Sequence, residues 1–162
     1  MARVGSNSRR RLERLRRRGQ KALARQSERN STPFRYDAHL RILGVGDHHD
    51  DITRQTGIIP THAHSKGQLR SRFMKRVYTE DLWMLSSPLG ESATMDAHLS
   101  WLRETIQPHY AYFEKLVARA SSADICLGCL SDSPYPFLEL QPSSLDRVRE
   151  LKLGFTFNFT CT

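Results

Sequence analysis

Apolar and polar residues alternate strictly in two stretches of the chain. In residues 34–42 (FRYDAHLRI), every second side chain is apolar, and those between are charged or histidine. A period of two is typical of a strand with one buried and one solvent-facing side. Residues 155–160 (FTFNFT) alternate in the same way. We therefore predict a strand at each place, with Phe155, Phe157 and Phe159 pointing together into the core.

A helix of several turns is predicted in the middle of the chain, where apolar residues recur every three or four positions. These residues are Met95, Leu99, Leu102 and Ile106. Ser92 or Thr94 can cap the start of this helix, and Pro108 should end or kink it. A second helical segment is predicted over residues 109–119.

Shorter patterns predict the remaining elements. Residues 49–57 have acidic residues near their start and end with glycine, which indicates a short helix. The stretches DLWMLSS (81–87) and ADICLGCL (123–130) are predicted to be strands. The stretch QPSSLDRVRELKLG (141–154) indicates a helix with Pro142 near its start and Gly154 after its end. Its apolar side is predicted to comprise Leu145, Val148 and Leu151.

The region from Thr61 to Tyr78 is the least regular part of the chain, and we predict a loop with a strand near residues 73–78. Five basic residues fall here before Glu80 and Asp81. Loops held by a rigid scaffold often carry binding residues, so this region is a candidate for binding an acidic protein surface or another anion. A solvated charged loop is the alternative. The candidate partner-binding residues are His62, His64, Lys66, Gly67, Arg70, Arg72, Lys75 and Arg76.

The order of elements predicts an α+β fold. Strands and helices follow one another through residues 34–162, which indicates a mostly antiparallel sheet with helices packed on one face, a ferredoxin-like sandwich in the broad sense. This length suits a single domain with one core.

Charge separates residues 1–33 from this domain. They carry eleven Arg or Lys and two acidic residues, whereas residues 34–162 carry fourteen basic and fifteen acidic residues. The first segment is predicted to be a disordered, basic extension, because its apolar residues are too few to bury a helix face. It could neutralise the phosphates of a nucleic acid. A solvated tail, a misplaced start codon and a transit peptide are the alternatives. The candidate arm residues are Arg9, Arg10, Arg11, Arg14, Arg16, Arg17 and Arg18.

The cysteines suggest a reducing compartment. There are three, an odd number, so they do not form a disulfide framework, and we expect a cytoplasmic protein without a membrane span. Cys126 and Cys129 have the spacing of a metal pair, but a zinc site needs four ligands. Cys161, His48, His49, His62 and His64 could supply others only through the fold. We predict buried thiols, and neither a metal nor a cofactor.

The stretch from Leu82 to Leu102 contains serines, an aspartate and a histidine, the residue types of a hydrolytic triad. Asp96 and His98 are two residues apart in a predicted helix, so their side chains do not face each other. Ser86 and Ser87 are not part of a G-x-S-x-G turn. We therefore predict no catalytic triad here and expect His98 to be a packing residue.

Several spaced features resemble a bacterial family of small proteins known as domain of unknown function 4279, over roughly residues 34–160. Its pattern includes an I-T-x-x-x-G-x-x-P-T step, a Lys-Gly pair, a Trp-x-x-x-Ser segment and an H-x-x-W-L helix. The resemblance implies a bacterial or phage origin and no particular activity or cofactor. The matching residues are Ile52, Thr53, Gly57, Pro60, Thr61, Lys66, Gly67, Trp83, Ser87, His98, Trp101 and Leu102.

Two functions from different classes remain. The first is a non-enzymatic protein-binding domain, such as an inhibitor or immunity-type protein, that uses the 61–78 region and the polar strand face. The second is nucleic-acid association through residues 1–33. A third alternative is an enzyme whose site assembles from distant His and Asp residues. The sequence leaves the partner and the oligomeric state open.

Overall fold

The computed structural model describes residues 34–46, 49–71, 73–133, 135 and 137–161. The predicted disorder of residues 1–33 therefore concerns a segment outside the described residues. From Phe34 onward the chain forms one compact unit. Its elements in order are β1 (Phe34–Leu43), α2 (His49–Thr56), β2 (His62–His64), β3 (Leu69–Ser71), β4 (Met74–Val77), β5 (Leu82–Ser86), α3 (Met95–Ile106), the 3-10 turn η1 (Gln107–His109), α4 (Tyr110–Arg119), β6 (Ser122–Ser131), α5 (Pro142–Glu150) and β7 (Gly154–Cys161).

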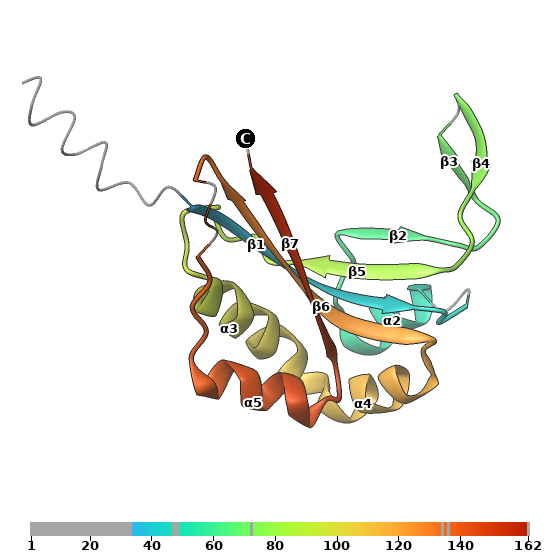
Figure 1. Cartoon of the computed structure of the whole chain (residues 1–162). Helices are drawn as coiled ribbons and strands as arrows, with labels where there is room; N and C mark the ends of the chain where they lie inside the picture. Colours follow the sequence, from blue (N-terminus) through green and yellow to red (C-terminus); the bar gives the residue numbers. More distant parts are fainter. Residues whose placement is uncertain (1–33, 47–48, 72, 134, 136, 162) are drawn as a thin grey trace, which may run out of the picture. The chain divides into compact units, whose positions relative to one another are not determined.

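Five strands form one sheet in the order β2-β5-β1-β6-β7. The neighbours are antiparallel except for β6 and β7, which are parallel. The segment with α5 connects this parallel pair, as a parallel connection requires. In Figure 1 the helices lie on one side of the sheet. The predicted α+β class with a mostly antiparallel sheet is confirmed.

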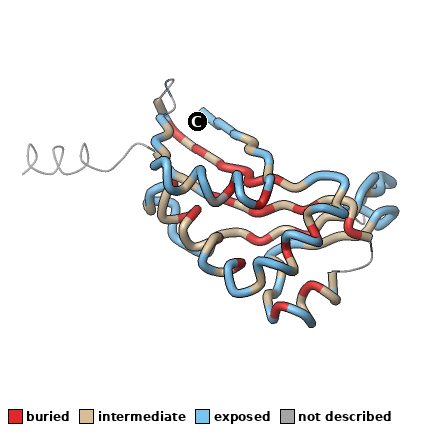
Figure 2. The backbone as a smooth tube through the Cα atoms, turned by 90° about the horizontal axis from the view of Figure 1, so that it is seen from below, coloured by how far each residue is buried: buried red, intermediate tan, exposed pale blue. Residues whose placement is uncertain are grey.

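The hydrophobic core lies between the sheet and the helices. In β1 the buried residues alternate, as the sequence predicts: Ala38, Leu40 and Ile42. Across the layer, the ring of Trp83 lies 5.9 Å from that of Phe113 between centroids, and both side chains are buried. Figure 2 shows buried residues along the strands and helices, whereas the last part of β7 is exposed.

The helices begin and end where their sequence signals indicate. The Thr94 hydroxyl accepts a hydrogen bond from Ala97 N (3.2 Å), which satisfies one of the free amides at the start of α3. Pro108 lies in η1, between α3 and α4, so the predicted break is confirmed. Gly57 follows α2 with φ 70°, the left-handed conformation that favours glycine after a helix.

Two expectations about packing are wrong. Phe155 packs against the core, but Phe157 and Phe159 are 44% and 47% exposed. All three share one side of β7, but the helices cover only the start of that strand. Leu145 was expected on the buried side of α5, yet it is exposed, while Val148 and Leu151 are buried.

Strands β3 and β4 form a separate two-stranded sheet, and we call residues 66–78 the hairpin arm. In Figure 1 it extends away from the five-stranded sheet beyond β2. The predicted strand near residues 73–78 is confirmed as β4, whereas β2 and β3 were not predicted.

Candidate functional site

Polar side chains form an ordered row on the side of the sheet opposite the core. His39 points to this side because its neighbours Ala38 and Leu40 point into the core. Its ring Nδ1 lies 2.8 Å from Ser86 Oγ on β5, the residue directly opposite in the strand pairing. Its Nε2 lies 3.0 Å from Asp37 Oδ1 on the same strand. A line of hydrogen-bonding groups therefore runs from Asp37 through His39 to Ser86.

Gly128 leaves room for this row. A Cβ built on Gly128 would lie 2.2 Å from Asp37 Oδ1, so the carboxylate occupies the space that a side chain on β6 would fill. Gly128 is also the residue directly opposite Asp37 in the strand pairing. Placement of the Asp37 carboxylate therefore depends on a glycine in the neighbouring strand.

A second polar cluster crosses β1, β6 and β7 on the same side. Arg41 donates from Nε to Asp124 Oδ1 (2.8 Å) and from Nη2 to Oδ2 (2.5 Å), and Thr156 Oγ1 donates to Oδ2 (2.5 Å). Burial alone would raise the pKa of Asp124, but the hydrogen bonds from Arg41 and Thr156 outweigh it and lower that pKa. The cluster is thus a bidentate, charge-assisted contact with fixed geometry.

The Asp37–His39–Ser86 row contains the residue types of a hydrolytic triad. In such a triad the carboxylate is buried and backbone amides near the nucleophile bind the oxyanion. Here the Asp37 side chain is 55% exposed, and the Ser86 amide already donates to Thr61 Oγ1 (2.9 Å). The Asp37 carboxylate is therefore not buried as in such a triad, and the Ser86 amide is not available to an oxyanion.

A second serine–histidine pair lies beneath the sheet. Ser87 Oγ is 3.0 Å from Nδ1 of His98, which is fully buried in the core, as predicted. Burial lowers the pKa of His98, opposed by the charge of Asp37. Asp96 instead accepts hydrogen bonds from Gln141 N (3.1 Å) and Ser144 Oγ (2.6 Å). The prediction that Asp96 does not orient His98 is confirmed.

The predicted partner-binding residues belong to β2 and the hairpin arm, and the structure describes all of them but Arg72. His62 and His64 contact each other, with Nε2 and Nδ1 3.2 Å apart. The His64 ring stacks on the Tyr78 ring, with 3.4 Å between centroids. The Arg70 guanidinium carbon lies 5.3 Å from the centroid of the Tyr78 ring. Burial, followed by the charges of His62 and His49, lowers the pKa of His64.

The remaining predicted residues present charge around the arm. Gly67 has φ 81° in the turn before β3, and the amide of Lys66 donates to Asp81 Oδ1 (2.6 Å). The exposed basic residues are Lys66, Arg70, Lys75 and Arg76. The candidate residues of the N-terminal arm, Arg9, Arg10, Arg11, Arg14, Arg16, Arg17 and Arg18, lie outside the described residues.

The hairpin arm also exposes apolar side chains that sequence reasoning missed. Phe73, between the two strands, is 89% exposed, and Leu69 and Val77 are exposed as well. The signal in the sequence is that Leu69, Phe73 and Val77 recur every fourth residue among basic residues. Likewise, the His39–Ser86 pair could have been anticipated only from knowledge of which strands are neighbours.

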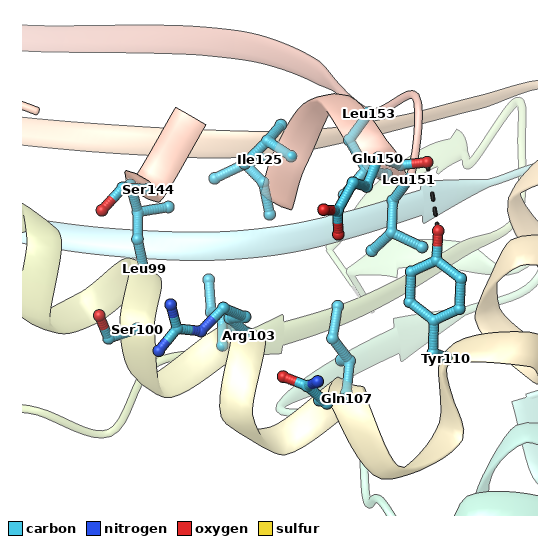
Figure 3. A pocket seen from close by; sticks show the side chains of 13 residues that line it. Leu99, Ser100, Arg103, Gln107, Tyr110, Ile125, Ser144, Glu150, Leu151 and Leu153 are labelled. Atoms are coloured by element: carbon cyan, nitrogen blue, oxygen red, sulfur yellow. Dashed lines mark hydrogen bonds between the residues drawn. The ribbon is translucent and has the colours of Figure 1, made fainter. Parts of the chain in front are cut away.

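A small cavity lies between α3 and α5 (Figure 3). Its volume is about 50 Å³, and apolar side chains such as Leu99, Ile125 and Leu151 line most of it. Tyr110 at its rim donates a hydrogen bond to the carbonyl of Glu150 (3.3 Å). Gln107 and Glu150, which also line it, are exposed, so this small space opens to solvent between the two helices and is smaller than most ligand pockets.

The two cysteines of the C-x-x-C pair point to opposite sides of the sheet. Cys126 lies opposite His39 and Cys129 lies opposite Tyr36 in the strand pairing. Both are buried, as predicted, and burial raises the pKa of each thiol. Among the described residues, no group of three or more His, Cys, Asp or Glu could hold a metal ion. Within the same part of the chain, no helix is long and apolar enough to cross a membrane.

A protein-family model described as domain of unknown function (DUF4279) matches residues 33–162. The chain belongs to the DUF4279 family. The resemblance found in the sequence is thereby confirmed. Neither the curated proteins nor the solved structures include a match to the chain.

Several residues that carried the DUF4279 resemblance have structural roles. Trp83, His98 and Leu102 are fully or almost fully buried in the core. The Thr53 hydroxyl donates to the Ile58 carbonyl (3.1 Å) and so holds the turn after α2. These four residues therefore stabilise the core and the turn after α2, whereas Lys66 and Gly67, which also carried the resemblance, belong to the exposed hairpin arm.

Proposed function

We propose that this DUF4279 protein is a non-enzymatic protein-binding domain of the inhibitor or immunity type. The observation that carries the proposal is the hairpin arm, which presents Phe73 among exposed basic side chains. Large aromatic residues that become buried at the centre of an interface commonly supply much of the binding free energy. The arm therefore offers an anchor with charges around it.

The positive charge of the hairpin arm indicates what kind of partner surface would fit it. Lys66, Arg70, Lys75 and Arg76 are exposed, and the nearby carboxylate of Asp81 already accepts hydrogen bonds from the amides of Lys66 and Gly46. An acidic surface with an apolar pocket for Phe73 is complementary to this pattern. In an inhibitor complex, that surface would surround the partner's active site.

The polar row supplies the second half of the proposed interface. The side chains of Asp37, His39 and Ser86 are held by one another on adjacent strands rather than on a mobile loop. Groups that are ordered before binding lose less conformational entropy when a partner arrives. The row is thus suited to specific hydrogen bonds, and the arm is suited to apolar and charge contacts.

Nucleic-acid association through residues 1–33 is the second candidate. Its support is the separation of charge, because the basic excess of the whole chain lies in that segment. Binding of this kind weakens steeply with rising salt, since each neutralised phosphate releases counterions. In the proposed protein interface, salt would screen the exposed charges around Phe73, but the apolar contact of Phe73 and the short-range hydrogen bonds of the polar row would persist. Salt dependence therefore distinguishes the two candidates.

The experiment compares capture by the full chain and two matched variants from a native lysate, at low and at moderate salt. The test variant, Phe73→Ser with Arg76→Glu, changes the hairpin arm. The control, Leu145→Ser with Lys115→Glu, makes the same types of change at exposed positions on the helical side. The captured protein is then purified and its dissociation constant is measured against all three chains.

We expect one acidic protein to remain bound at moderate salt, and the arm variant to weaken its binding at least about tenfold while the control does not. Equal binding by the arm variant would contradict the proposed interface. Retention of nucleic acid alone, lost at moderate salt, would support the second candidate instead.

A further inference from the structure

In the part of the chain that the structure describes, β7 is an edge strand without the features that usually protect an edge. Among the described strands it pairs only with β6, in an unbroken register from Gly154 to Cys161. Its sequence, GFTFNFTC, has no proline and no charged residue. Natural edge strands are commonly short, charged, bulged or covered, because a bare edge can pair with another chain. The opposite edge follows this rule, since β2 has only three residues.

One side of β7 carries an aromatic ladder. Phe155, Phe157 and Phe159 stack in sequence, with centroids 6.0 and 6.3 Å apart and interplanar angles of 16° and 4°. Phe155 meets the core, but the next two rings are almost half exposed. The ladder therefore continues past the helical layer and exposes apolar surface beside a free strand edge.

We propose that β7 pairs with β7 of a second copy of the chain in antiparallel orientation about a twofold axis. A charged strand would have to bury its charges against the aromatic ladder, so the partner strand should be uncharged. Among the described strands longer than five residues, β7 alone has no charged side chain, since β1 and β6 both contain aspartate. The strand is therefore its own best complement.

A register centred on Phe157 fits the ladder. It places Phe157 opposite the partner's Phe157 and Phe155 opposite the partner's Phe159. Residues directly opposite each other in an antiparallel pair point to the same side, so the six rings would form one continuous surface. The pairing would join two five-stranded sheets and satisfy the free backbone groups of both edges.

The oligomeric state of the full chain tests this pairing. Sedimentation equilibrium is measured after nuclease treatment and at high salt, so that bound nucleic acid does not contribute to the mass. Phe157→Lys places a charge in the ladder, and Phe159→Lys provides a second variant if the first does not fold. Ile59→Lys is the control, because it introduces the same charge at an exposed apolar residue outside β7 and outside the hairpin arm.

We expect a dimer whose dissociation constant rises at least about tenfold in the β7 variants and not in the control. The register is tested by oxidising Phe157→Cys in a Cys161→Ser background, where the two new thiols would face each other across the axis. Thr160→Cys in the same background should not crosslink. A monomeric wild-type chain, a dimer unaffected by both β7 variants, or crosslinking at residue 160 instead of 157 would overturn the proposal.

Discussion

Gly44 shows how one backbone position limits the choice of residue. Its φ is 69°, and a Cβ there would lie 2.4 Å from Ser121 Oγ and 2.7 Å from Ser121 Cβ. We predict that Gly44→Ala lowers the free energy of unfolding by about 2–3 kcal/mol, from the left-handed conformation and the collision together. Gly57→Ala is the control. Its φ is 70°, but a Cβ added there would have no atom within 4 Å beyond its chain neighbours. This substitution should therefore lower the free energy of unfolding by only about 1 kcal/mol. If urea unfolding shows equal losses of stability in Gly44→Ala and Gly57→Ala, the collision with Ser121 does not contribute.

Buried His98 should make stability depend on pH. Burial lowers the pKa of His98 in the folded protein below its ordinary value of 6.5. As the pH falls below that value, the unfolded chain takes up a proton that the folded chain does not, so the free energy of unfolding decreases. The decrease is at most about 1.4 kcal/mol per pH unit for this one group.

We therefore predict that His98→Gln lowers stability at neutral pH but flattens its decline in mild acid. The measurement is urea unfolding over a series of pH values. His109→Gln, at a partly exposed histidine, serves as the control. A decline that is equally steep in His98→Gln and the wild type would show that other groups cause it.

Individual site residues were the hardest to predict from sequence. The alternation in residues 34–42 places His39 on the polar side of β1, but nothing local indicates that Ser86 lies opposite it. That contact depends on β5 being the neighbour of β1, which is a property of the whole sheet. The rejection of an Asp96–His98 pair could be made locally, because helical spacing alone separates those side chains.

The carboxylate of Asp96 links helix α3 to the start of helix α5. Asp96, in the first turn of α3, accepts hydrogen bonds from Gln141 N and Ser144 Oγ at the start of α5. It thus fixes the start of α5 to a different helix. We predict that Asp96→Ala destabilises the protein by about 1 kcal/mol and speeds hydrogen exchange across residues 142–151. Glu104→Ala, on the exposed side of α3, should leave that exchange unchanged; faster exchange there too would point to a general loss of α3.

The Arg41–Asp124–Thr156 cluster should make part of the stability sensitive to acid. The lowered pKa of Asp124 means that its charged form stabilises the fold above the ordinary pKa of 3.8, and that this contribution is lost as the pH falls through the folded pKa. We predict that Asp124→Asn lowers the free energy of unfolding at neutral pH by about 2–3 kcal/mol. Its urea unfolding midpoint should then fall less than that of the wild type on acidification; parallel declines would contradict this role.

Elements with clear periodicity were predictable, and those governed by tertiary context were not. The Met95–Ile106 pattern identified α3, and the Phe34–Ile42 alternation identified β1. The hairpin arm was missed in part because its strands of three and four residues give too short a signal. In β7 the alternation correctly predicted a strand with its phenylalanines on one side. Whether helices cover that side depends on how the helices pack against the sheet, which periodicity in β7 does not report.

The class of fold followed from the order of elements, because helices must cover a sheet that has one apolar side. The strand order β2-β5-β1-β6-β7 did not follow, since it depends on pairings between distant segments. The two edge strands of this sheet differ, because β2 has only three residues, whereas β7 is longer and has no charged side chain. The strand order also places the hairpin arm beyond the β2 edge, far along the sheet order from β7, so the proposed partner-binding arm and the proposed self-association strand are different parts of the surface.

The unequal distribution of charge leads to a last prediction for the whole chain. The basic excess lies in residues 1–33, and residues 34–162 have one more acidic than basic residue. We predict that the full chain is retained on a heparin column at low salt and released as salt rises, while a chain beginning at residue 34 passes through. Both chains should have the same thermal midpoint, because the core lies within residues 34–162. Retention of the shorter chain would instead locate polyanion binding on the hairpin arm, and Arg76→Glu in that shorter chain would then weaken it.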